Sequence, residues 1–102
     1  MIRKVSFAAG KAILDARTDA VLLDVREEEE YITGHAAGAL LLPVGQIDAE
    51  SAAGAIPSRD TPVLLYCRSG MRSRRAAKAL DALGYTQLYD LGSLVGWPYG
   101  LE

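Results

Sequence analysis

The chain has 102 residues, of which 50% are hydrophobic and 24% are charged, and its formal net charge is −2. This length and composition suit one globular domain with one core, so we expect residues 1–102 to form a single domain. The small negative charge excludes the broad electrostatic attraction that nucleic-acid-binding and membrane-surface proteins use. The single cysteine cannot form an internal disulfide, and no apolar signal segment follows the first residues. Both features predict a cytoplasmic protein.

Short apolar segments alternate with segments of helical spacing along the whole chain. The alternation is typical of an α/β fold with a parallel or mostly parallel sheet. The clearest strand is 21–25, which is short, continuously apolar and followed by polar residues. In chain order we expect a strand at 2–5, a helix at 7–16, a strand at 21–25, a helix at 27–32, a strand at 39–42, a weak helix at 46–53, a loop at 56–61, a strand at 63–66, a helix at 74–83, a strand at 87–90 and at most a helical turn at 94–99.

Polar residues end two of these strands. Asp24 and Arg26 end the strand at 21–25, and Cys67 ends the strand at 63–66. In a parallel sheet the carboxyl ends of the strands share one edge, where ligands bind, so we expect these three residues at that edge. Asp24 and Arg26 are two residues apart on an extended segment and therefore point to the same side. We interpret them as an ion pair that fixes the loops, in preference to direct substrate ligands.

The surroundings of Cys67 predict an ionised, reactive thiol. A buried strand gives way there to a tight loop and a helix N-terminus, where backbone N–H groups and the helix dipole stabilise negative charge. Four arginines lie between Arg68 and Arg75, at the end of the helix that is already positive. Stability alone favours acidic residues in that turn, so the arginines indicate an anion-binding site. A lone cysteine is often an inert core residue, but these polar neighbours favour a nucleophile or sulfur carrier.

The loop after Cys67 contains the groups that an anion requires. Gly70 allows a backbone conformation in which several N–H groups point inward. Arg68 and Arg72 have guanidinium groups that can bind two oxygens of an anion at once. The alternative for them is a solvated cationic face. Three further cations of the following helix are interpreted as surface charge or a partner-binding patch: Arg74, Arg75 and Lys78.

His35 is the only histidine, and it precedes Cys67 by 32 residues. A catalytic Cys–His pair is one interpretation. The setting between Gly34 and Ala36 favours a loop anchor instead. One cysteine and one histidine make no zinc site, so we expect neither a metal nor another cofactor.

Two segments resemble the signature motifs of the rhodanese-like family. Residues 21–43, VLLDVREEEEYITGHAAGALLLP, resemble the leading motif, and residues 63–73, VLLYCRSGMRS, resemble the active-site loop. The ending at 89–93 with Trp97 is similar to the closing segment of the family, although Ser93 stands where a second glycine is common. The resemblance covers nearly the whole chain. It implies an α/β, rhodanese-like fold with a five-stranded, mostly parallel sheet and helices on both faces.

The resemblance also implies a double-displacement reaction. The thiolate of Cys67 takes the outer sulfur of an anionic donor such as thiosulfate, and cyanide or a thiol then accepts this sulfur from the Cys67 persulfide. Because the chain has no second cysteine, the acceptor comes from outside and includes protein thiols. Cys67 is the expected catalytic residue. The loop expected to bind the substrate is Arg68, Ser69, Gly70, Met71, Arg72 and Ser73, and the supporting residues are Asp24, Arg26 and His35.

Other functions remain open from the sequence. A carboxylate donor of the mercaptopyruvate type also suits arginine. A non-enzymatic persulfide carrier would use Arg74, Arg75 and Lys78 to dock on a partner protein. Phosphatase relatives of this fold place an arginine six residues after the cysteine, whereas Ser73 occupies that position here. Arg72 comes one residue before that position and Arg74 one residue after it. This disfavours phosphatase chemistry, because a catalytic group must lie within a narrow distance and angle of the reacting atoms.

Overall fold

One sheet of five parallel strands forms the centre of the molecule. The computed structural model describes residues 1–102. Every pairing between neighbouring strands is parallel, so the expected mostly parallel sheet is confirmed and is in fact entirely parallel. In the spatial order of the sheet the strands are β1 (Ile2–Lys4), β5 (Leu88–Ser93), β4 (Val63–Cys67), β2 (Val21–Asp24) and β3 (Leu40–Leu41).

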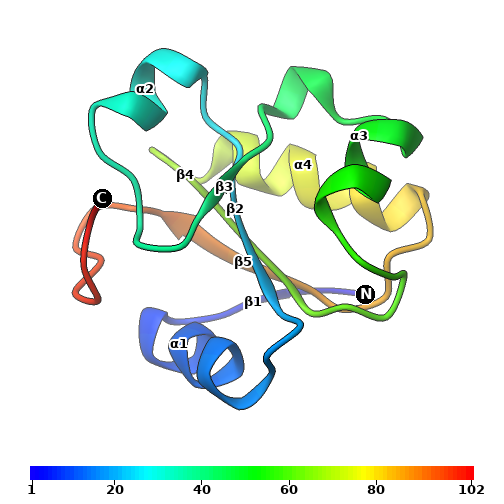
Figure 1. Ribbon diagram of the computed structural model, residues 1–102, viewed down its shortest axis with the longest axis horizontal. Helices are drawn as coiled ribbons and strands as arrows, with labels where there is room; N and C mark the ends of the chain where they lie inside the picture. Colours follow the sequence, from blue (N-terminus) through cyan, green and yellow to red (C-terminus); the bar gives the residue numbers. More distant parts are fainter.

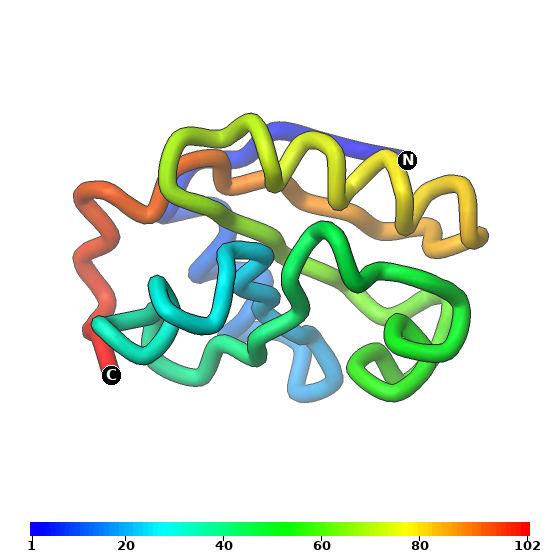
Figure 2. Tube along the Cα trace, turned by 90° about the horizontal axis from the view of Figure 1, so that it is seen from above, coloured from blue at the N-terminus to red at the C-terminus, as the bar shows by residue number.

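Helices cover both faces of this sheet. Figure 1 shows α1 on one face, and α2, α3 and α4 on the opposite side. Figure 2 shows the same arrangement from above, with α4 running along the strands. The longest helix, α4, has 12 residues, and none of the helices has the length and apolar character needed to cross a bilayer. The helices are α1 (Phe7–Ala16), α2 (Glu28–Ile32), α3 (Ala49–Ala55) and α4 (Met71–Ala82).

Three expected elements differ in the structure. The helix expected at 74–83 begins at Met71, because Gly70 adopts a left-handed conformation (φ +96°) that turns the chain directly into the helix. The weak helix expected at 46–53 is replaced by a 3₁₀ turn (Val44–Gln46) and α3. The start of α3 is displaced because Asp48 caps it, accepting the Ser51 N–H at 2.8 Å. The strand expected at 87–90 runs from Leu88 to Ser93. Residues 94–99 contain a single turn, closed by the Trp97 N–H on the Leu94 carbonyl, which agrees with the expectation of at most one helical turn.

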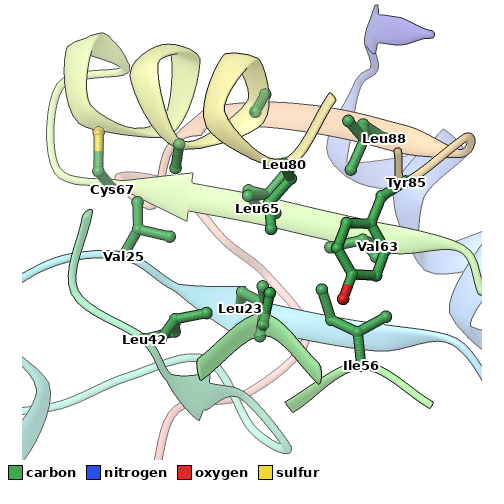
Figure 3. Packing of buried hydrophobic residues seen from close by; sticks show 13 residues of the cluster. Leu23, Val25, Leu42, Ile56, Val63, Leu65, Cys67, Leu80, Tyr85 and Leu88 are labelled. Atoms are coloured by element: carbon green, nitrogen blue, oxygen red, sulfur yellow. The ribbon is translucent and has the colours of Figure 1, made fainter. Parts of the chain in front are cut away.

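The alternation of side chains along β4 divides the core into two clusters. Val63, Leu65 and Cys67 face α4, as Figure 3 shows, and belong to a cluster of 13 buried residues. Leu64 and Tyr66 face the opposite side, where α1 packs. Because β4 is buried on both faces, its side-chain directions follow from period two and leave Cys67 on the α4 side.

We expect Leu65→Ala to lower the free energy of unfolding by about 2–5 kcal/mol, because a cavity would remain between the central strand and α4. Leu65 is 0% exposed. The matched control is Ile32→Ala, where the side chain is 72% exposed and the expected loss is within about 0.5 kcal/mol. Denaturant unfolding measures both values. Equal losses in the two variants would contradict this description of the core.

Candidate active site

The carboxyl ends of β2, β4 and β5 meet at one edge of the sheet. Parallel register pairs Asp24 with Tyr66 and Cys67 with Ser93. The backbone N–H of Leu94 donates to the carbonyl of Cys67 at 2.8 Å, which holds the segment after β5 against the end of β4. The structure therefore brings Asp24 and Cys67 to the same edge, where the sequence placed them.

The sulfur of Cys67 lies against the loop that leads into α4. The Gly70 N–H donates to Cys67 Sγ, with 2.9 Å between nitrogen and sulfur. Figure 3 shows the sulfur pointing toward this loop and Val25 packed on the other side of the side chain. Cys67 is 0% exposed and belongs to the hydrophobic cluster of the α4 face. Its surroundings are thus aliphatic on one side and polar on the other, and the sulfur is covered from solvent.

Two opposing effects act on the ionisation of Cys67. Burial alone would raise the pKa of the thiol, and this is the largest single effect. The N–H groups of Ser73, Gly70 and Ser69 and the hydroxyl of Ser73 act together in the other direction. The net result is a pKa below the ordinary thiol value of 9.0, so the polar side of the environment determines the outcome.

A buried carboxylate on β5 holds the first turn of α4 in place. Asp90 Oδ1 accepts hydrogen bonds from the hydroxyl of Ser73 at 2.7 Å and from the N–H of Gly92 at 2.8 Å. The hydrogen bond to Ser73 ties the first turn of α4 to β5. The role of Asp90 is not predicted by the sequence motifs. The available signal was its position as an acidic residue at the end of a predicted strand, the same pattern as that of Asp24.

The two arginines of the loop differ in their partners. Arg72 binds the carboxylate of Glu30 on α2 through two hydrogen bonds, one of them 2.9 Å long. This contact lowers the pKa of Glu30 to about 2, so the carboxylate stays charged above that pH, and it raises the pKa of Arg72. Arg68 takes part in none of the ion pairs of the structure. Arg68 is therefore available to an anion, whereas Arg72 must exchange Glu30 for it.

Asp24 and Arg26 form the ion pair expected from the sequence. The guanidinium of Arg26 contacts both carboxylate oxygens, with 2.7 Å from Nη2 to Asp24 Oδ2, and the same nitrogen donates to the carbonyl of Gly34 at 2.7 Å. Both residues are buried. The pair therefore joins the end of β2 to the loop before β3.

Tyr66 completes this network, a role that sequence reasoning missed. Its hydroxyl donates to Asp24 Oδ2 at 2.6 Å and accepts the N–H of Ala36 at 3.1 Å. Burial and the hydrogen bond to Asp24 raise the pKa of Tyr66, so the phenol stays protonated and continues to donate. In the sequence Tyr66 was part of an apolar strand, and nothing local indicated its partners 42 and 30 residues away.

His35 lies in the same loop and anchors it. Its ring stacks on Tyr31 with centroids 3.7 Å apart, and Nδ1 lies 2.9 Å from the carbonyl oxygen of Tyr31. Its backbone N–H and carbonyl pair with the backbone of Glu102. The one hydrogen bond of the ring goes to Tyr31 and the ring contacts Glu102 on its other side, which fits the interpretation of a loop anchor.

A cavity of about 360 Å³ opens at this edge of the sheet. Polar residues of the site line one side of it, including Arg68 and Glu30, and apolar residues after β5 line the other, including Leu94 and Trp97. No group of three potential metal-ligating side chains is present. The guanidinium of Arg68, at the start of the cysteine loop, is therefore the one in this cavity without an acidic partner.

Comparison with known proteins identifies the family. The model of the rhodanese-like domain matches residues 7–98. Thiosulfate sulfurtransferase PspE of Escherichia coli is 35% identical over 72 residues, which cover 71% of this chain and 68% of PspE. YtwF of Bacillus subtilis is 32% identical over 96 residues, which cover 94% of this chain and 90% of YtwF. The solved structure of a rhodanese with anions from E. coli superposes with a TM-score of 0.75 at 30% identity, covering 81% of this chain and 96% of that one. The chain belongs to the rhodanese-like family of sulfurtransferases.

We expect Arg26→Met to lower the free energy of unfolding by about 3–5 kcal/mol, because it leaves the buried carboxylate of Asp24 without its cation. The double variant Asp24→Asn with Arg26→Met should lose less, since no uncompensated charge remains. Arg17→Met is the control, because its pair with Asp19 is on the surface and is worth at most about 1 kcal/mol. Thermal and denaturant unfolding measure the three variants. The account of this network is wrong if Arg26→Met and Arg17→Met are equally stable.

Proposed function

We propose that this chain is a thiosulfate sulfurtransferase that works through a persulfide on Cys67. The observation that carries the proposal is the hydrogen bond from the Gly70 N–H to Cys67 Sγ, within a group of donors that lowers the pKa of the thiol. A thiolate is the nucleophile that sulfur transfer needs. The same donors would stabilise the terminal charge of a persulfide.

In the first half-reaction the Cys67 thiolate attacks the outer sulfur of thiosulfate. The sulfur–sulfur bond of the donor breaks, sulfite leaves with the bonding electron pair, and Cys67 carries the persulfide anion. In the second half-reaction cyanide or a thiolate attacks the terminal sulfur and the Cys67 thiolate leaves. No oxidant is needed, because each step passes one neutral sulfur atom between nucleophiles.

Arg68 and Arg72 would bind the sulfonate oxygens of the donor in this proposal, together with the backbone of Ser69, Gly70 and Met71. Arg68 has no acidic partner, so it is the first contact. The sulfur is covered in the structure, and Arg72 is bound to Glu30. We infer that the donor anion displaces Glu30 from Arg72 as it enters. Arg72 then exchanges a carboxylate for a dianion, and Arg68 supplies the second positive charge.

The relatives support thiosulfate as the donor and leave the acceptor open. PspE is named a thiosulfate sulfurtransferase, and the similar E. coli structure is that of a rhodanese with anions. Because Cys67 is the only cysteine, the acceptor is an external thiol or cyanide. We propose that residues 1–102 act as one domain and work in the reducing cytoplasm, where such a thiol stays reduced.

We expect the protein to form thiocyanate from thiosulfate and cyanide, and Cys67→Ser to reduce the rate to the uncatalysed background, because a serine hydroxyl does not ionise at neutral pH. Intact-mass measurement after thiosulfate treatment should show a gain of one sulfur atom in the wild type and none in the variant. Ser51→Ala, in the cap of α3, is the control for a substitution outside the site.

Thiocyanate formation at a comparable rate by Cys67→Ser would exclude the proposed nucleophile. A sulfur gain from mercaptopyruvate but not from thiosulfate would replace the proposed donor with a carboxylate donor. Measurable sulfur loading without turnover on cyanide or small thiols would favour a persulfide carrier.

A further inference from the structure

A second cavity lies on the other side of the cysteine loop, between α4 and β1. Its volume is about 540 Å³. Figure 2 shows β1 beside α4, at the margin of the sheet. We call this cavity the α4–β1 groove; the residues that line it are Ile2, Lys4, Ser69, Gly70, Met71, Arg74, Lys78 and Asp90.

The α4–β1 groove is strongly basic in a chain whose net charge is negative. Lys4, Arg74 and Lys78 line it, and none of them forms an ion pair. The one acidic residue in the lining is Asp90, whose carboxylate accepts hydrogen bonds from Ser73 and Gly92 and is buried. Three cations from two elements thus converge on one hollow without a partner. Such an arrangement attracts an anionic ligand.

The position of the groove connects it to the cysteine. One end is formed by Ser69, Gly70 and Met71, and Gly70 also donates to Cys67 Sγ. The other end reaches Lys78, seven residues further along α4, which is about 10 Å at 1.5 Å per residue. An extended peptide of about three residues spans this length.

Apolar side chains in the lining indicate a peptide segment as the occupant. They flank the cations: Met71 is 75% exposed, and Ile2 is also accessible. A small inorganic anion would bind the cations without contacting these side chains, whereas a peptide would cover both.

We propose that the α4–β1 groove binds an acidic, thiol-bearing segment of a partner protein, which accepts sulfur from Cys67. This inference rests on the proposed function and names the acceptor class. The acidic residues lie along Lys4, Arg74 and Lys78, and the thiol lies at the end next to Gly70. The acceptor thiol loses its proton to water, and its thiolate attacks the terminal sulfur of the Cys67 persulfide. The enzyme's sulfur–sulfur bond breaks, the Cys67 thiolate is restored, and the partner carries the persulfide.

The test uses two synthetic acceptor peptides on the full chain. One has a cysteine preceded by four glutamates, and the other has four glutamines in their place. We expect kcat/KM for the acidic peptide to exceed that for the neutral one by about tenfold or more at low ionic strength. Added salt should reduce the difference in kcat/KM between the two peptides, because it screens the charges. The double variant Arg74→Glu with Lys78→Glu should abolish or reverse the preference, while its rate with thiosulfate and cyanide stays within about twofold.

Arg75→Glu is the matched control, because Arg75 is exposed on the same helix but does not line the groove. Equal kcat/KM for both peptides in the wild type, or equal damage from Arg75→Glu and from the double variant, would overturn the inference. Calorimetric binding of the acidic peptide with serine in place of cysteine tests the groove independently of turnover. Failure to form thiocyanate would contradict the proposed donor chemistry alone. The peptide-binding role of the groove would still be supported if the serine peptide binds and the double variant abolishes this binding.

Discussion

The hydrogen bond from the backbone of Gly70 to the sulfur of Cys67 is the interaction on which the site depends. It exists because β4 ends at Cys67 and a left-handed glycine turns the chain straight into α4. The first turn of the helix then presents N–H groups to the sulfur instead of to water. Burial opposes ionisation of the thiol, and these donors outweigh it. A loop with the same residues but a later helix start would lose the donors of this first turn.

Buried polar contacts keep this arrangement rigid from two sides. On β5, Asp90 holds the hydroxyl of Ser73 and therefore the first turn of α4. On β2, the network of Asp24, Arg26 and Tyr66 holds the loop that precedes β3. Asp24 has the guanidinium of Arg26 as its partner, and Asp90 has two hydrogen bonds to its Oδ1 atom, so both buried carboxylates have partners. The backbone around the carboxyl edge of the sheet is thus held in place from both sides, and the contact of Arg72 with Glu30 is the one that the proposed donor must break.

The accessible charges of the site lie on opposite sides of the cysteine loop. Arg68 faces the cavity beside the segment after β5, whereas Arg74 and Lys78 face the α4–β1 groove. Arg72 lies between them and is neutralised by Glu30. In the proposed double displacement, the donor binds beside Arg68 and the acceptor binds in the α4–β1 groove. Cys67 itself is covered from solvent in this structure, before either half-reaction.

Local pattern was enough to predict the sheet, the position of Cys67 at its edge and the turn at Gly70. Those features follow from apolar runs, strand ends and glycine, which act over a few residues. The contact of Arg72 with Glu30 joins residues 42 apart, and periodicity carries no information about such pairs. The role of Tyr66 was missed for the same reason, whereas Asp90 had a local signal, its position at the end of a predicted strand. The helix expected from Arg74 begins three residues earlier, at Met71, because helical spacing of apolar residues is visible only further along and the left-handed turn at Gly70 starts the helix at once.

Titration of the Cys67 thiolate by its ultraviolet absorbance tests the central claim most directly. The account predicts a midpoint below the ordinary 9.0, with the thiolate appearing at lower pH than in an unfolded chain. Because a lowered pKa means that the folded state binds fewer protons, this thiol should add stability as pH rises through its folded pKa toward 9.0. Ser73→Ala removes the hydroxyl that ties the first turn of α4 to Asp90, which loosens the backbone donors around the sulfur, and should move the midpoint upward. A wild-type midpoint at or above 9.0 would contradict the account.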